Sequence, residues 1–147
     1  MLTTASVVEK SYLRFQLLLV LVLFIITSMQ LNTVSTCPVL CTCSNRTGGI
    51  SVECLDQGLT SIPSDFPNDS LSMILAGNEF SIVETGSFQN YSVLEFIVLA
   101  GCRIDVIQPG AFAFLFQLTS LNLADNNIKS IATGTFVGLN NLTTLYV

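Results

Sequence analysis

The sequence predicts an α/β solenoid, in which one short strand and one returning segment repeat along the chain and stack into a single core. An apolar pattern restarts at Ser70, Leu94, Leu118 and Leu142, each 24 residues after the one before. Its spacing fits neither a single helix nor a single strand. A constant period of roughly 20 to 29 residues is typical of one solenoid unit. Four clustered cysteines precede the first repeat, where the bare end of such a core needs a cap.

The N-terminal segment has the order of a secretory signal peptide. Two basic residues, Lys10 and Arg14, precede an uninterrupted apolar run from Leu17 to Ile26, and small residues for cleavage follow at Ser28 and Ser35. The alternative is an uncleaved membrane anchor, but a spanning helix needs about 20 apolar residues, more than this run supplies. We therefore expect cleavage after Ser28 or Ser35 and a secreted or cell-surface location.

The charge balance argues against several classes of partner. The chain has five Lys and Arg residues and ten Asp and Glu residues, for a net charge of −5. Beyond Ser35 only Arg46, Arg103 and Lys129 remain as cations, against nine carboxylates, so this part carries a net charge near −6. Such a surface repels phosphate backbones and anionic lipid, so we expect no nucleic-acid partner.

The composition also argues against an enzyme. The chain has no histidine, and therefore no Ser/His or Cys/His nucleophile pair and no histidine metal ligand. Acids such as Asp105 and Asp125 fall in different repeats at turn positions, where solvated carboxylates are common. No glycine-rich phosphate loop follows a strand and opens a helix. We expect no catalytic residue, no cofactor and no metal.

The four clustered cysteines are Cys37, Cys41, Cys43 and Cys54. They admit a four-thiolate zinc site or two disulfides. Export to an oxidising compartment favours disulfides, and a C-x-C spacing fits a zinc site with paired C-x-x-C arms poorly. Counting alone leaves three pairings open.

The strands and the core follow from the repeat positions. After the cysteines, Ile50, Val52 and Cys54 alternate with polar residues, which predicts a half-buried strand within the cap. The fourth and sixth positions of the repeats are predicted to face the core from a parallel sheet: Met73, Leu75, Ile97, Leu99, Leu121 and Leu123. Positions eleven and fourteen continue this core: Phe80, Val83, Ile104, Ile107, Ile128 and Ile131.

Two further positions recur in every repeat. Position nineteen is Phe88, Phe112 and Phe136, which predicts a phenylalanine column on a convex side of irregular backbone or short helical turns. Position nine is Asn78, Cys102 and Asn126. A buried asparagine there satisfies backbone groups at the bend after each strand. Cysteine is small and tolerates burial, so Cys102 is expected to be a buried free thiol.

These residues resemble the extracellular leucine-rich-repeat family, whose pattern is L-x-x-L-x-L-x-x-N-x-I-x-x-I with a later phenylalanine. The stretch from Cys37 to Pro67 resembles the cysteine-rich N-terminal cap of that family, with its CPxxCxC, V-x-C and L-x-x-I-P segments. Members include Toll-like receptors, variable lymphocyte receptors and matrix proteoglycans. The resemblance implies a horseshoe with a parallel β-sheet on its concave face, which binds proteins and sometimes glycans or lipids. It also implies disulfides between Cys37 and Cys43 and between Cys41 and Cys54.

The expected organisation follows from the resemblance and the period. We expect a signal peptide, a cap, three repeats and the start of a truncated fourth: residues 1–35, 36–69, 70–93, 94–117, 118–141 and 142–147. The family normally has a C-terminal cysteine cap, and none follows here. We therefore expect a fragment, with any membrane-spanning or signalling domain beyond Val147.

The candidate ligand surface is the set of outward strand positions. Ile74, Phe96 and Val98 lead it, because large apolar side chains on a solvent-facing sheet commonly mark a protein contact. Polar outward positions complete it: Ser51, Glu53, Ser72, Ser120 and Asn122. The competing explanation is strand propensity, which places such residues on a sheet without any ligand. We expect a recognition module of a receptor or secreted binder, or alternatively a structural protein of the extracellular matrix.

Four N-x-S/T sequons predict N-glycosylation in an exported chain: Asn45, Asn68, Asn90 and Asn141. Asn45 and Asn90 are expected in loops away from the concave face.

Overall fold

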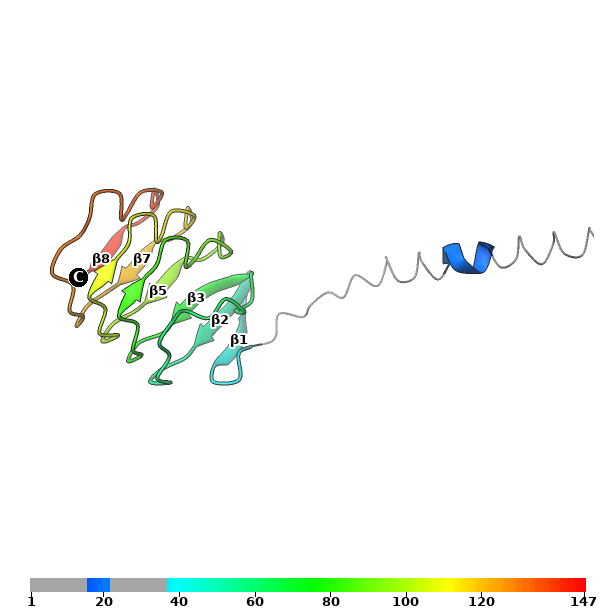
Figure 1. The fold of residues 1–147 in the computed structure, drawn as a ribbon, viewed down its shortest axis with the longest axis horizontal. Coiled ribbons are helices and arrows are strands. Elements are labelled where there is room, and N and C mark those ends of the chain that lie inside the picture. Colours follow the sequence, from blue (N-terminus) through cyan, green and yellow to red (C-terminus); the bar gives the residue numbers. More distant parts are fainter. Residues whose placement is uncertain (1–15, 22–36) are drawn as a thin grey trace, which may run out of the picture. The chain divides into compact units, whose positions relative to one another are not determined.

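The computed structural model describes residues 16–21 and 37–147 (Figure 1). The chain divides into two units, Met1–Val34 and Ser35–Val147. Residues 16–21 form a short helix. The rest of the predicted signal peptide lies outside the described residues. No helix within the described ranges has the length and apolar character needed to cross a membrane.

The second unit is built on one six-stranded sheet (Figure 1). In spatial order its strands are β1 (Thr42–Arg46), β2 (Gly49–Glu53), β3 (Ser70–Ile74), β5 (Phe96–Val98), β7 (Ser120–Asn122) and β8 (Thr144–Tyr146). β1 and β2 form an antiparallel hairpin, and every later neighbour is parallel. From β3 to β8 paired residues are 24 apart, as Met73, Ile97, Leu121 and Leu145 show. The predicted solenoid and its period are confirmed.

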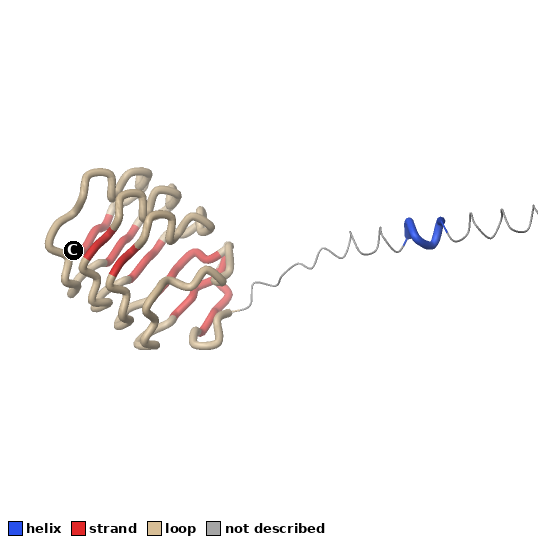
Figure 2. Tube along the Cα trace, in the orientation of Figure 1, coloured by secondary structure: helices blue, strands red, loops and turns tan. Residues whose placement is uncertain are grey.

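The returning segments run along the side opposite the sheet. They consist of turns and two short parallel strands, β4 (Ile82–Val83) and β6 (Val106–Ile107) (Figure 2). No helix occurs within residues 37–147. The convex side was predicted to be either irregular backbone or short helical turns, and the structure has irregular backbone there.

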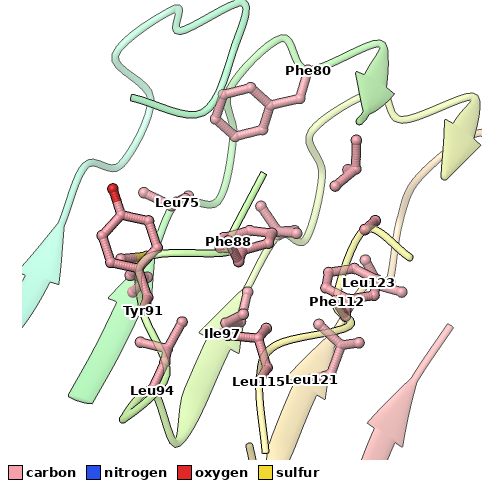
Figure 3. Packing of buried hydrophobic residues seen from close by; sticks show 14 of the residues in the cluster. Leu75, Phe80, Phe88, Tyr91, Leu94, Ile97, Phe112, Leu115, Leu121 and Leu123 are labelled. Carbon is pink, nitrogen blue, oxygen red and sulfur yellow. The ribbon is translucent and has the colours of Figure 1, made fainter. Parts of the chain in front are cut away.

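The core lies between the sheet and these returning segments (Figure 3). All six inward strand residues from Met73 to Leu123 are buried, as predicted. The phenylalanine column is present: the Phe88 and Phe112 ring centroids are 5.7 Å apart, and those of Phe112 and Phe136 are 6.3 Å apart, both pairs stacked. A stack of this kind fills the convex side with large rings that repeat with the backbone.

Burial falls off in the last returning segment. Ile128 is partly buried and packs against the core, as predicted, whereas Ile131 is 40% exposed, so the prediction that it continues the core was wrong. In a solenoid each repeat buries its apolar side chains against both neighbours. Within the described chain no later returning segment packs against these two isoleucines.

Strands β2, β3, β5 and β7 are each followed by a bend of left-handed backbone. The equivalent residues Asp56, Gly77, Gly101 and Asp125 have φ angles of 53°, 73°, 64° and 57°. Glycine adopts this region without strain, and aspartate is among the few other residues that tolerate it. The bend turns the chain sharply from the sheet into the core and leaves backbone groups without strand partners.

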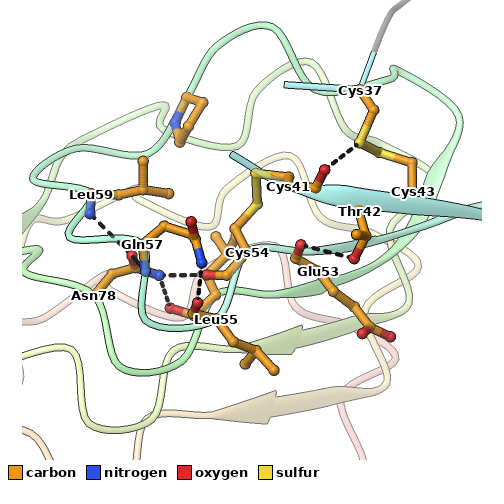
Figure 4. Close-up of a disulfide and its surroundings, with 12 residues drawn as sticks. Cys37, Cys41, Thr42, Cys43, Glu53, Cys54, Leu55, Gln57, Leu59 and Asn78 are labelled. Carbon is orange, nitrogen blue, oxygen red and sulfur yellow. Dashed lines mark hydrogen bonds between the residues drawn. A yellow bond between two sulfur atoms is a disulfide. The ribbon is translucent and has the colours of Figure 1, made fainter. Parts of the chain in front are cut away.

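Asn78 satisfies the first of these bends and joins it to the cap (Figure 4). Its Nδ2 donates to the carbonyl oxygens of Cys54 and Leu75, both at 2.7 Å. Its Oδ1 accepts from the amides of Gln57 at 3.1 Å and Leu59 at 3.0 Å. One side chain therefore completes four hydrogen bonds across two neighbouring repeats.

Asn126 repeats this arrangement one bend further on. Its Nδ2 donates to Leu99 O at 2.8 Å and to Leu123 O at 2.7 Å. Its Oδ1 accepts from the amides of Cys102 and Ile104, both at 3.0 Å. The predicted role of position nine is confirmed.

The cap is closed by two disulfides, Cys37–Cys43 and Cys41–Cys54 (Figure 4). This is the pairing that the family resemblance implies, and it leaves no thiolate of the cluster for zinc. Cys54 and Val52 are fully buried at the start of the core. The Cys41–Cys54 link closes a loop with a sequence separation of 13, worth about 3 kcal/mol in the chain-entropy model.

We predict that Asn126→Ala lowers the free energy of unfolding by about 3 kcal/mol, because two backbone amides and two carbonyls lose their partner. Chemical denaturation with disulfides intact measures this. The matched control is Asn127→Ala: this side chain is exposed, so its loss changes stability by less than about 0.5 kcal/mol. Equal effects of the two variants would contradict the assigned role.

Candidate binding face

The sheet presents its outward side chains in two rows. Because paired residues are in register, the first row is Ser51, Ser72, Phe96, Ser120 and Thr144, and the second is Glu53, Ile74, Val98, Asn122 and Tyr146. All eight residues of the predicted ligand surface fall in these rows. The structure thus brings them together on one face, since successive side chains of a strand alternate between core and solvent.

The centre of this face is apolar. Phe96 is 46% exposed, and Ile74 and Val98 are partly buried beside it. Ile74 and Val98 are direct cross-strand neighbours, and Phe96 lies on the same strand face as Val98. These three residues form a continuous patch, here called the apolar patch.

The far end of the second row holds an aromatic residue that the sequence analysis did not select. Tyr146 pairs with Asn122 and is 56% exposed. The signal was present in the sequence, because Tyr146 occupies the same repeat position as Ile74 and Val98. The face therefore has an aromatic side chain on both β5 and β8.

Ser51 differs from its prediction. It belongs to the outward row but is only 3% exposed. It lines a hollow of about 290 Å³ together with Arg46, Leu71, Ser72, Ile74, Glu95 and Phe96. The hairpin brings Arg46 of β1 to this hollow, and β3 and β5 supply most of its other lining residues, so neighbouring side chains cover the serine.

The charges around this face are sparse. Arg46 and Glu95 both line the hollow, and Glu53 lies in the second row. Among the residues that the structure describes, Arg103 and Glu79 form an ion pair, at 2.8 Å and well exposed to solvent. Arg46 and Glu95 have no ion-pair partner in that same part of the chain.

Cys102 is the free thiol of the described chain, and it is buried. Its Sγ donates to Leu75 O at 3.1 Å, so the residue serves the bend as predicted. Burial raises the pKa of the Cys102 thiol, although backbone hydrogen bonds oppose the shift. A buried, protonated thiol is a poor nucleophile. Across residues 16–21 and 37–147 no group of three His, Cys, Asp or Glu side chains is placed to hold a metal ion.

The four sequon asparagines are all exposed. Asn45 lies in strand β1 and not in a loop, which corrects the sequence prediction. It pairs with Ile50, whose side chain packs against the core, so Asn45 still faces away from the outward rows. Asn141 donates through Nδ2 to Phe116 O at 2.7 Å. Whether glycans are attached stays a prediction.

Two protein families match parts of the chain. The family described as Leucine rich repeat N-terminal domain matches residues 36–67, and the family described as Leucine rich repeat matches residues 93–147. Among similar proteins, the insulin-like growth factor-binding protein complex acid labile subunit of Rattus norvegicus is 41% identical over 63 residues, which is 42% of this chain and 10% of that protein. Leucine-rich repeat-containing protein 55 of Mus musculus is 37% identical over 78 residues, 52% of this chain and 25% of that protein.

Solved structures of the same fold are also found. The crystal structure of human 5T4 (Wnt-activated inhibitory factor 1, trophoblast glycoprotein) has a TM-score of 0.69 and 30% identity, covering 75% of this chain and 41% of 5T4. The TLR13–ssRNA13 complex has a TM-score of 0.64 and 34% identity, covering 70% of this chain and 15% of that one. The chain thus spans less than half of each of these proteins. None of their names denotes an enzyme.

We predict that Cys102 resists alkylation in the native chain. Because burial raises the pKa of its thiol, less thiolate is present at pH 8 than in an exposed cysteine. Iodoacetamide should therefore modify the native chain on the order of 100-fold more slowly than the unfolded chain with intact disulfides. Mass spectrometry measures the single added carbamidomethyl group. Rapid native labelling at pH 8 would show that the bend opens readily.

Proposed function

We propose that this chain, an extracellular leucine-rich-repeat protein with a cysteine-rich N-terminal cap, is a recognition module that binds a protein ligand on the outward face of its sheet. It would form the N-terminal part of a receptor ectodomain or of a secreted binder. The observation that carries the proposal is the apolar patch of Ile74, Phe96 and Val98, which lies in register across β3 and β5.

The patch has the features of a contact surface. A phenylalanine with nearly half of its surface in water contributes little to the core, and large apolar side chains that converge on a solvent-facing sheet commonly mark protein contacts. Polar residues of both rows surround it: Glu53, Ser72, Ser120 and Asn122. An apolar centre with a polar rim is the usual anatomy of a protein interface.

Charge favours a protein over a nucleic acid as the ligand. The TLR13 structure holds single-stranded RNA, so a protein of this fold can carry such a ligand. The present chain has nine carboxylates and three cations beyond Ser35, and Arg46 is the cation that lines the hollow on this face. A phosphate backbone requires several such contacts for useful affinity.

We also infer that residues 1–35 are the export signal and that exported chains carry N-glycans. The exposure of all four sequon asparagines supports attachment at Asn45, Asn68, Asn90 and Asn141. None of the four belongs to the outward rows, so glycans attached there would leave the apolar patch open.

The test of the binding face is Phe96→Asp. A charge in the centre of an interface is expected to weaken binding by 30-fold or more, equivalent to about 2 kcal/mol. The chain would be screened against purified extracellular proteins, and each partner found would be titrated with the variant on a biosensor. Ile74→Asp tests the neighbouring position in the same way.

The matched control is Phe114→Asp. Phe114 is 48% exposed, close to the 46% of Phe96, but it lies in a returning segment away from the sheet. It should leave binding unchanged. Unaltered affinity of a folded Phe96→Asp variant, or equal losses with Phe114→Asp, would rule out the apolar patch as the contact surface.

Glycosylation has its own test. We predict that the chain secreted from animal cells loses mass on treatment with an N-glycosidase, and that Asn→Gln variants at the four sequons each remove one step of that loss. Ligand affinity should not change after deglycosylation, because the glycans lie off the binding face. A secreted chain whose mass is unaffected by the enzyme would contradict attachment.

A further inference from the structure

We infer that the hollow beside the apolar patch holds one tyrosine side chain of the partner protein. This deepens the proposed function and rests on it, because the tyrosine is the anchor of the same interface. The hollow is lined by Arg46, Ser51, Leu71, Ser72, Ile74, Glu95 and Phe96. Its volume of about 290 Å³ is at the lower limit of ligand pockets, which suits one large side chain better than a folded segment.

Three of the lining side chains are apolar. Phe96 and Ile74 belong to the apolar patch, and Leu71 of β3 adds a third contact. The exposed ring of Phe96 offers an aromatic partner a stacked or edge-to-face arrangement, which adds to the gain from buried area. The lining therefore favours an aromatic ring as the body of the occupant.

Ser51 lies in the hollow with a hydroxyl that has no hydrogen bond. The residue is 3% exposed, and within the described chain neither a side chain nor a carbonyl pairs with its Oγ. Because no fully buried side-chain polar atom of that part of the chain lacks a partner, this oxygen keeps a small solvent-accessible surface at the hollow. Buried polar groups are nearly always paired, and an apolar occupant such as phenylalanine would seal this hydroxyl off. An occupant with a donor and acceptor at its tip would complete it, and the phenol of tyrosine is such a group.

The two charges at the hollow give an ionic side chain no net advantage. Arg46 and Glu95 are both unpaired within the described residues and carry opposite signs. An ammonium group would meet the guanidinium of Arg46 as well as the carboxylate of Glu95. A carboxylate would meet the same two groups with the signs reversed, so attraction and repulsion offset each other. Like charges at close range are unfavourable. An ionic occupant would lose its hydration without a net electrostatic gain, which favours a neutral occupant. Tyrosine is a neutral aromatic residue whose hydroxyl can both donate and accept.

The experiment uses two small probes and needs no partner protein. N-acetyl-tyrosinamide and N-acetyl-phenylalaninamide are titrated into the secreted, disulfide-intact, ¹⁵N-labelled chain, and amide chemical shifts are followed by NMR. We expect saturable shifts at Ser51, Ser72 and Phe96, with the tyrosine probe bound about five-fold more tightly, the effect of one neutral hydrogen bond.

Two variants and one control assign the preference. Ser51→Ala should bind both probes equally, because the hydroxyl that distinguishes them is gone. Ser120→Ala is the matched control: the same change in the same row, three strands away from Ser51 and outside the hollow, which should keep the five-fold ratio. Phe96→Ala, a change at an exposed side chain, should weaken the binding of both probes.

Equal affinities of the two probes, shifts centred elsewhere, or a preference that survives Ser51→Ala would overturn the inference. The amide spectrum of each variant reports whether it is folded. If neither probe binds at the hollow while Phe96→Asp still weakens binding of a protein partner, the inference about the hollow is wrong and the proposed binding face is supported. If both fail, the proposed function is wrong as well.

Discussion

Strands β2, β3, β5 and β7 each end at a bend whose backbone groups lack strand partners, and one buried or partly buried side chain per repeat satisfies them. Asn78 and Asn126 each make four such hydrogen bonds, three of which reach the preceding unit of the solenoid. Cys102 takes the position between them and donates to Leu75 O. Because each of these side chains ties its own bend to the one before, the column fixes the 24-residue register of the parallel strands.

The proposed binding face is a consequence of that register. Side chains that are 24 residues apart in the sequence become neighbours across the sheet, so Ile74 and Val98 meet and Phe96 lies between two serines. The cap adds what the repeats lack. Its antiparallel β1 brings Arg46 to the edge of the hollow, where Ser51 is buried. A periodic sheet thereby gains one non-periodic feature, and this is where specificity for a partner can arise.

The periodic part of the fold could be predicted from the sequence because the same residue types recur at equivalent positions of every repeat. The inward leucines, the phenylalanine column, the asparagine bends and the disulfide-bonded cap were all confirmed. The errors occur where periodicity ends. The antiparallel β1–β2 hairpin places Asn45 in a strand and buries Ser51 of β2. Ile131 is exposed because burial in a solenoid depends on a neighbour and not on the residue itself. The hollow is lined by residues of β1, β2, β3 and β5 and by Glu95. These residues are far apart in the sequence, so no local pattern predicts the hollow.

Native-state hydrogen exchange tests the central role of the bend column most directly. The amides of Cys102 and Ile104 are bonded to the Asn126 side chain and to no strand partner. If the column holds the repeats together, these amides should exchange only through global unfolding, as slowly as those of the sheet. Fast exchange of both, with the sheet amides still protected, would mean that the bends open locally and that the strands alone set the register.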